Sequence, residues 1–403
     1  MSQRFKDSNN SLEGQLQSAD DAYFPAIPKD IRDNTLSYPE RYSLLKTKLG
    51  AEHDKVELQA ALKSLEDEIT QGASDGDLYD RIILLNKHGK SHIESVISHA
   101  SRLVDCLSKR ECTEKCSTRL GECEDKTKVM GECNDSKKNK LSPFEIFILL
   151  CAIQIHDIGN KNGRVEHTTS FKDNFDRYAN ESFITDAVLK KCIYNIARVH
   201  GGKINGDADT VEAAKLRVET EIMKFDVRQR LLAAILRFAD ELADDNTRNI
   251  DVDNMPEYSK IFHAYSNSLH SVTIEKIVKE SAYRVNLSYF LSESEALCER
   301  KKLEKDSKGN LTPVITTLLR EIIKRTIKME YERRYCARYF LPYFTLKSIR
   351  VVIEFDIDDP PMEPIEYTLE ETGYPSANIE LSSETERKIV AMEEKYASIG
   401  GVK

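Results

Sequence analysis

The stretch of residues 142–159, which reads SPFEIFILLCAIQIHDIG, decides the fold of this chain. It opens with a capping box, in which Ser142 occupies the N-cap and Glu145 the third helical position. Pro143 stands at the first helical position, where its missing N–H costs nothing. Gly159 is a natural helix stop. The sequence therefore predicts a helix with well-defined ends.

Between these ends, the apolar run at residues 147–153 predicts that the helix is buried. The run leads into an adjacent histidine and aspartate, His156 and Asp157. Both side chains cost free energy to bury unless a partner satisfies them. We therefore expect a partner for this pair among the other polar residues on apolar helix faces.

Two such residues are present. His92 falls on the apolar face of a helix predicted over residues 80–108, and Asp240 falls on that of a helix predicted over residues 227–243. Each alone has an ordinary explanation, because core histidines are usually hydrogen-bonded and a lone aspartate often caps a helix or forms an ion pair. Two histidines and two aspartates from three apolar helices instead indicate a metal site, since one divalent cation compensates both carboxylates.

The bulk composition narrows the class of protein. A length of 403 residues suggests about two or three domains, and a hydrophobic share of 40% is enough for a core. With 32% charged residues and a mean hydropathy of −0.50, the chain is expected to be soluble. No apolar run is long enough to cross a bilayer, so no membrane association is expected. The net charge of −9 disfavours a broad nucleic-acid-coating surface but allows a local basic groove.

The cysteines bear on the compartment. The start of the chain, MSQRFKDSNNSLEG, carries no hydrophobic signal region, so no export is expected. Nine cysteines without a secretory context favour reduced thiols and a cytoplasmic protein. Four of them lie in a Lys-, Glu- and Cys-rich insertion at residues 109–140, namely Cys112, Cys116, Cys123 and Cys133. Their spacing is not the C-x2-C pairing of most structural zinc sites. A solvated, flexible insertion with reduced thiols, able to act as a lid or docking arm, is the preferred interpretation, and zinc binding is the alternative.

The periodicity of apolar residues predicts a mainly α fold, with an all-helical core followed by a small α+β subdomain of ββαβ order. The expected segments are a flexible N-terminal arm at 1–40, a helical extension at 41–79, a helical metal-binding domain at 80–267, the ββαβ subdomain at 268–358 and an acidic tail at 359–403. The extension is predicted to be one amphipathic helix, or a pair broken near Gly50, that packs on the core or offers a surface to a partner.

Further elements are expected within these segments. Helices are predicted at 181–199, 210–223, 311–337 and 384–396. Strands are predicted at 271–278, 283–291 and 349–357, where the apolar residues recur with the shorter period of a strand.

The four polar residues on apolar faces resemble the ligand series of the HD-domain metal-dependent phosphohydrolase superfamily, whose signature is H…HD…D on an all-helical core. Their flanks agree with this resemblance. HGKSHIESV at 88–96 resembles the first-ligand helix of an HD-CE-like subgroup with an HGxxH first motif, AIQIHDIG at 152–159 resembles the central helix, and LRFADEL at 236–242 resembles the closing segment L-R-x-A-D-x-L. The resemblance covers about residues 80–250.

The resemblance implies one or two divalent ions. The first would be bound by His92, His156, Asp157 and Asp240, with Asp157 bridging to a second. Mixed histidine and carboxylate ligation suits Mn, Fe, Ni or Zn, and Mg less well. His167 and His200 fall where relatives place ligands of a second metal or phosphate contacts, so both are catalytic candidates beside Asp157. The alternative for each is a surface or loop histidine.

Other residues are candidates for binding the substrate. His88 would bind phosphate or shape the entrance to its helix. Lys161, Arg164 and Arg248 are candidate phosphate contacts, and a solvated loop cation is the alternative for each. No GYP motif follows His200, which disfavours a cyclic-di-GMP phosphodiesterase of the HD-GYP type.

The expected activity is hydrolysis of a phosphoester or phosphodiester in a nucleotide, cyclic nucleotide or nucleic acid by a metal-activated water. The alternative is an HD-fold ligand-sensing or scaffold module that binds a partner protein, through the N-terminal helices or the ββαβ unit, without turnover. Two buried aspartates favour the enzyme, because a scaffold does not need them. The resemblance also implies a role in bacterial defence beside a partner protein. The sequence leaves open whether the chain forms an oligomer.

Overall fold

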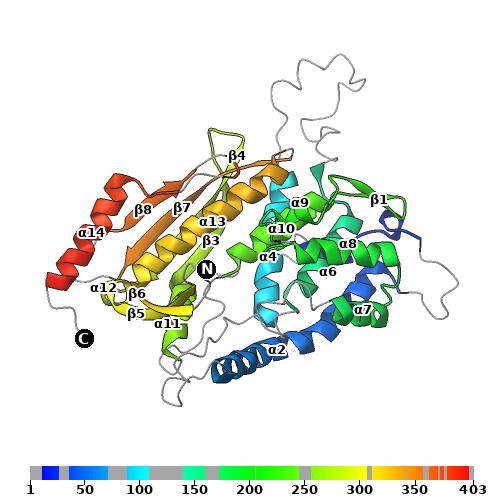
Figure 1. The fold of residues 1–403 in the computed structure, drawn as a ribbon. Helices are drawn as coiled ribbons and strands as arrows, with labels where there is room; N and C mark the ends of the chain where they lie inside the picture. The colour runs from blue at the N-terminus through cyan, green and yellow to red at the C-terminus, as the bar shows by residue number, and fades with distance from the viewer. Residues whose placement is uncertain are drawn as a thin grey trace.

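The computed structural model describes residues 11–26, 36–70, 89–108, 139–158, 172–204, 206–244, 256–305, 311–341, 343–356, 363–370, 373–375 and 379–398. Within these ranges the chain is mainly helical and has two parts, a helical part and a part built on a β-sheet (Figure 1). No helix of the described residues is both long enough and apolar enough to cross a membrane.

The helical part contains nearly all of the N-terminal half and one short hairpin. Its helices are α1 (Leu12–Gln17), a 3-10 turn (Asp21–Tyr23), α2 (Tyr38–Thr70), α4 (Lys90–Ser108), α6 (Pro143–Ile155), α7 (Lys172–Glu181), α8 (Ala187–Arg198), α9 (Thr210–Ala213) and α10 (Gln229–Leu242), and its hairpin is β1 (Thr220–Ile222) with β2 (Phe225–Val227).

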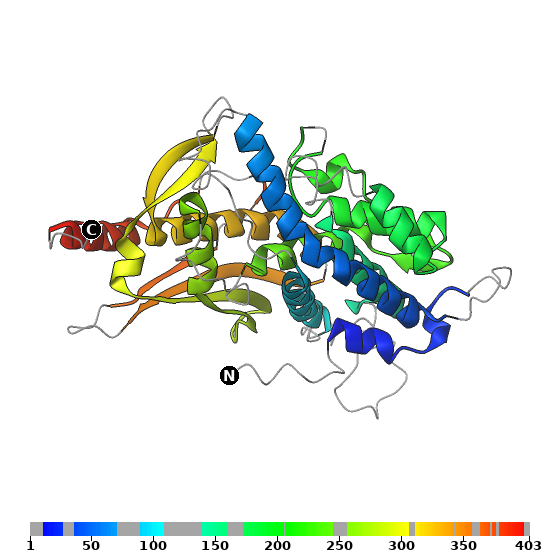
Figure 2. The same cartoon turned by 90° about the horizontal axis from the view of Figure 1, so that it is seen from below.

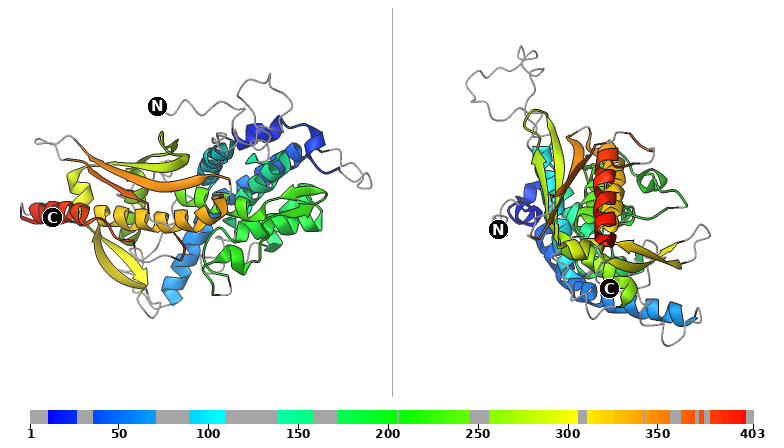
Figure 3. Two further views of the ribbon diagram at one scale, coloured as in Figure 1. Left: turned by 90° about the horizontal axis from the view of Figure 1, so that it is seen from above. Right: turned by 90° about the vertical axis from the view of Figure 1, so that its left-hand side faces the viewer.

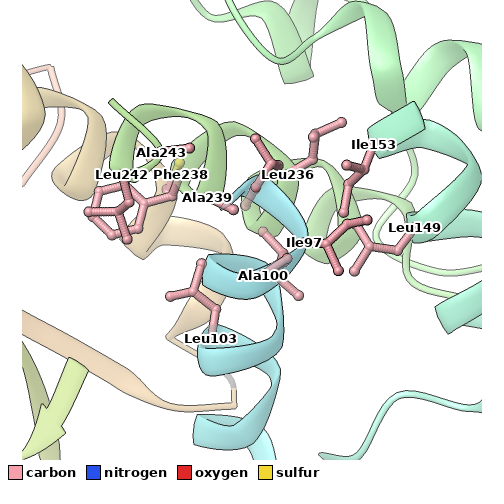
Figure 4. Packing of buried hydrophobic residues seen from close by; sticks show 14 of the residues in the cluster. Ile97, Ala100, Leu103, Leu149, Ile153, Leu236, Phe238, Ala239, Leu242 and Ala243 are labelled. Carbon is pink, nitrogen blue, oxygen red and sulfur yellow. The ribbon is translucent and has the colours of Figure 1, made fainter. Parts of the chain in front are cut away.

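Helix α6 is the centre of this part. The predicted capping box is confirmed, since the Ser142 hydroxyl accepts from the Glu145 amide and the Glu145 carboxylate accepts from the Ser142 amide. Every residue from position 144 to 155 is buried, as expected for a helix that is apolar on all sides. Figure 4 shows Leu149 and Ile153 of α6 facing Ile97 of α4, with side chains of α10 beside them.

The sheet part follows α10. Its elements are α11 (Glu257–Ser268), β3 (Leu269–Lys276), β4 (Ala282–Leu291), α12 (Glu293–Leu297), β5 (Glu299–Lys305), β6 (Leu311–Thr317), α13 (Leu318–Phe340), β7 (Thr345–Phe355), β8 (Ile365–Leu369) and α14 (Ser383–Ser398). The strand order is β3-β4-β7-β8, with β4 and β7 parallel and the outer pairs antiparallel. Helix α13 lies between this sheet and the β5–β6 hairpin (Figures 2 and 3).

Helix α13 also joins the two parts of the molecule. Three ion pairs connect it to α10 and to the residue just beyond the C-cap of α10, with nitrogen–oxygen distances of 2.6, 2.7 and 2.5 Å: Arg237–Glu332, Glu241–Lys328 and Asp244–Arg325. Arg237 and Glu241 are four residues apart and therefore share one face of α10, and Asp244 follows two residues after the helix ends. They flank Asp240, so the sheet part helps to fix the helix that carries this aspartate.

The N-terminal arm differs from its prediction. Residues 11–26 pack on the core instead of forming a loose arm, because Leu12 and Leu16 of α1 are fully buried and Ser11 caps the helix. Helix α2 runs without interruption through Gly50, so the alternative of a broken pair is wrong. Its residues Leu45 and Leu49 are buried, as the packing interpretation expects.

The helix predicted over 210–223 is wrong. Only α9 forms there, and the chain then turns into the β1–β2 hairpin. Ile222 pairs with Phe225, and the two turn residues, Met223 and Lys224, have φ of 53° and 71°. Positive φ at both central residues is the geometry of a type I′ hairpin turn, which glycine and asparagine usually supply.

Other boundaries also shift. The helix predicted over 181–199 begins at Ala187, after Phe183 with φ of 60°. The expected ββαβ order is extended, because α12 and the β5–β6 hairpin precede α13 and β8 pairs with β7. Helix α14 lies where the tail helix was predicted. The cysteines of the insertion lie outside the described residues.

Candidate metal centre

Three helices bring the predicted ligands to one place. His92 lies in the first turn of α4, His156 and Asp157 follow the last turn of α6, and Asp240 lies in the last turn of α10. One ligand atom from each of the four residues lies within 4.8 Å of all the others. Of the four residues only Asp240 is partly exposed, so solvent reaches the cluster from the side of Asp240.

The separations of these atoms suit a shared cation. Nε2 of His92 is 3.4 Å from Oδ2 of Asp157 and 3.2 Å from Oδ1 of Asp240. Nε2 of His156 is 3.4 Å and 3.5 Å from the same two oxygens. Ligands about 2.1 Å from one ion, at angles of about 90–109°, are about 3.0–3.4 Å apart. The four side chains therefore fit a divalent ion. Their nitrogen–oxygen distances are at or beyond the upper end of the range for good hydrogen bonds.

The tautomer of His156 is fixed by its own helix. Its Nδ1 lies 2.8 Å from the carbonyl oxygen of Ile153. Because a carbonyl only accepts, Nδ1 donates the proton, and the lone pair of the neutral ring is on Nε2, which faces the carboxylates. His156 is fully buried, and no described group is within hydrogen-bonding geometry of its Nε2. A bound divalent cation would satisfy this nitrogen.

His200 adds a fifth side chain to the centre. Its Nδ1 lies 2.7 Å from the carbonyl oxygen of Ala197, which fixes its tautomer in the same way. Its Nε2 is 3.6 Å from Oδ1 of Asp157, whereas the contacts given for His92 and His156 are to Oδ2. The rings of His156 and His200 are 5.0 Å apart. The two oxygens of Asp157 thus face two different sets of nitrogen donors.

The charges of the apo centre are strongly coupled. Burial lowers the pKa of His156, but the carboxylates of Asp157 and Asp240 outweigh it and raise that pKa to about 9. Burial raises the pKa of Asp240, but its contacts with His156 and His92 hold it well below its usual range. In the absence of metal a proton therefore occupies this site, and an incoming cation must displace it.

A further histidine, which the sequence analysis did not predict as a site residue, lies near the centre. His53 of α2 is 1% exposed. Burial lowers its pKa to about 4, with repulsion from His156 as the second cause, so it lies within electrostatic range of the ligands. Its signal in the sequence was its position four residues after Leu49, on the buried stripe of α2.

Replacing His53 with Leu should make the metal-free protein less sensitive to acid. A histidine with pKa 6.5 when unfolded and about 4 when folded contributes stability that is present above pH 6.5 and lost as the pH falls towards 4. The full difference corresponds to about 3 kcal/mol. Urea unfolding with EDTA at pH 7 and pH 4.5 should show a smaller loss for His53→Leu than for wild type. His270→Leu, at an exposed histidine, is the matched control, and equal losses in all three proteins would refute the effect.

The remaining predicted site residues are not placed by the structure. His88, Lys161, Arg164, His167 and Arg248 lie outside the described residues. The roles expected for them stay predictions.

Comparison with known proteins gives one match. A family model described as HD-CE matches residues 67–292. This span contains all four residues of the cluster and His200, and it begins after the buried part of α2 that carries His53. No curated protein and no solved structure matches the chain.

Proposed function

Because the chain belongs to the HD-CE family, whose model matches more than half of its length, we propose that it is a metal-dependent phosphohydrolase. The substrate is a nucleotide, cyclic nucleotide or nucleic acid, and the scissile bond is a phosphoester or phosphodiester. The single observation that supports this proposal most is the placement of Asp157 among three histidines. A buried carboxylate there, with a second one on α10, is typical of a catalytic cation site.

The residues divide into two sets around Asp157. His92, His156 and Asp240 would hold one ion together with Oδ2 of Asp157, while His200 faces Oδ1 and would contribute to a second ion or contact the phosphate. The chemistry that such cations supply when bound is activation of water for attack on phosphorus and stabilisation of charge on the phosphoryl oxygens. The backbone carbonyls of Ile153 and Ala197 accept from Nδ1 of His156 and His200 and so orient the Nε2 atom of each ring towards Asp157.

The proposal is tested by release of phosphate or nucleotide from a mixed panel in the presence of Mn²⁺. The panel holds dNTPs, NTPs, cyclic nucleotides and short single-stranded DNA and RNA. Release by wild type that EDTA stops and added metal restores would support the hydrolase and identify its substrate class.

The same panel separates the enzyme from the scaffold. A ligand-sensing or scaffold module would bind metal or nucleotide but release no product from any substrate in the panel. In that case the surfaces left to a partner include the outer face of the sheet, where Phe290 of β4 is 49% exposed. Bound ligand without turnover would therefore favour the scaffold.

Replacing His200 with Ala should lower the rate of hydrolysis by about 10–100-fold without abolishing it. The variant keeps both carboxylates and the other two imidazoles, so the first ion still binds. Steady-state kinetics should show the loss mainly in kcat if His200 acts in the reaction, and titration with Mn²⁺ should show one weakened class of site. Unchanged kinetics would exclude His200 from the centre.

A further inference from the structure

A second site lies at the other end of α6. A cavity of about 150 Å³ opens between the start of α2 and the start of α8, and its lining includes Tyr38, Arg41, Thr185 and Asp186. Tyr38 packs edge-on against Phe144 and Phe147, which are twelve and nine residues before His156. At 1.5 Å of rise per residue, the two sites are about 14–18 Å apart along the helix.

Arg41 is a buried cation without a carboxylate partner. The residue is 6% exposed. Its Nε donates to the carbonyl of Leu36 at 3.0 Å and its Nη1 to the carbonyl of Phe183 at 2.9 Å. Its Nη2 is buried and has no hydrogen-bond partner, and within the described ranges no carboxylate is at ion-pair distance. The Tyr38 ring, whose centroid is 5.4 Å from Cζ of Arg41, compensates this charge only in part, so the unsatisfied Nη2 points to a missing anion.

The other polar groups of the cavity define the anion more closely. Tyr38 is held by stacking on Phe24, and burial raises its pKa to about 12, so its phenol stays protonated as a donor. The cavity also lies at the N-terminus of α8, a helix of 12 residues whose dipole favours negative charge. These features attract an oxyanion.

Asp186 adds an acceptor to the same cavity. Its Oδ1 caps α8 by accepting from the amide of Leu189 at 2.8 Å, and no described group bonds its other oxygen. A fully deprotonated anion would be repelled by this carboxylate. An oxyanion that keeps one proton can donate to Asp186 while it accepts from Arg41.

We propose that this cavity binds a protonated phosphate group, with Arg41 and Tyr38 donating to its oxygens and Asp186 accepting from its hydroxyl. The cavity volume of about 150 Å³ is sufficient for the five heavy atoms of phosphate, because one water needs only about 10–15 Å³ of such space. The site is separate from the metal centre. Its two residues on α2 precede the span that the family model matches, whereas Thr185 and Asp186 lie within that span. The proposal does not depend on the hydrolase activity.

The test is calorimetric titration of the metal-free full chain with inorganic phosphate and, separately, with sulfate, which carries no proton at neutral pH. Wild type should bind phosphate more tightly than sulfate. Arg41→Gln should weaken phosphate binding by about tenfold or more. The matched control is Arg230→Gln, because Arg230 pairs with Glu212 on the surface, and it should bind like wild type.

Asp186→Asn supplies a second test that does not depend on Arg41. Asparagine still caps α8, so the fold is retained, but its amide donates where the carboxylate accepted. The preference for phosphate over sulfate should therefore shrink or reverse. His156→Ala, which disrupts the metal centre, should leave phosphate binding unchanged.

Three results would overturn the proposal. The first is the absence of saturable phosphate binding in wild type, which would mean that water fills the cavity. The second is loss of phosphate binding in His156→Ala. The third is a preference for phosphate over sulfate that survives in Asp186→Asn. If Arg41→Gln fails to fold by circular dichroism, the Asp186→Asn comparison decides alone.

Discussion

Replacing Asp157 with Ala should abolish hydrolysis, with a fall of at least about a thousandfold. Its carboxylate lies 3.4 Å from the Nε2 atoms of His92 and His156 and 3.6 Å from that of His200. The substitution therefore removes a carboxylate that lies near all three of these histidines. The helical content should stay unchanged, because Asp240 still faces His156, so the substitution leaves no buried imidazolium without a carboxylate.

The measurement compares release from the best substrate of the panel, with Mn²⁺, for wild type, Asp157→Ala and Asp226→Ala. Asp226 is an exposed aspartate in β2, and its variant should keep full activity. Circular dichroism verifies that each protein is folded. An active Asp157→Ala protein would refute the assignment of the centre.

Replacing Glu145 with Ala should cost about 3–5 kcal/mol of the free energy of unfolding. Glu145 is 3% exposed, and its two oxygens accept from the amide and the guanidinium of Arg228, at 2.7–3.0 Å. Without the carboxylate, Arg228 is a buried cation that keeps the carbonyls of Asn139 and Lys140 and the ring of Tyr343 but loses its anionic partner. A loss of this size is a large fraction of the roughly 5–15 kcal/mol that stabilises a typical domain.

Urea unfolding checks this prediction against an exposed ion pair whose arginine lies two residues after Arg228. Arg230 of α10 pairs with Glu212, which is 46% exposed, so Glu212→Ala should cost less than about 1 kcal/mol. The double variant Glu145→Leu with Arg228→Met should recover part of the loss, because the stranded charge is removed. Equal effects of Glu145→Ala and Glu212→Ala would contradict the account.

The local signals of the sequence predicted the centre of the fold well. The capping box, the apolar run and the His-Asp pair all lie within residues 142–159, and the structure confirms the helix with its cap. The clustering of His92, His156, Asp157 and Asp240 was expected because each lay on an apolar helix face that had to turn inward.

What the sequence could not predict depends on residues that are distant along the chain or on unusual backbone angles. The second role of Glu145 requires Arg228, 83 positions away. The turn at Met223 and Lys224 contains neither the glycine nor the asparagine that such a turn usually carries. Strand β5, with the sequence ERKKLEK, is highly charged, and its Lys302 is buried only because Glu304 and Glu321 pair with it.

The central claim is that His92, His156, Asp157 and Asp240 bind a divalent metal ion. The most direct measurement is the metal content of the purified chain by mass spectrometry, after loading with Mn²⁺ and gel filtration, beside the Asp240→Ala variant. The account predicts at least stoichiometric metal in wild type and a loss of most of it in the variant. Wild type without bound metal, or equal metal in both proteins, would contradict it.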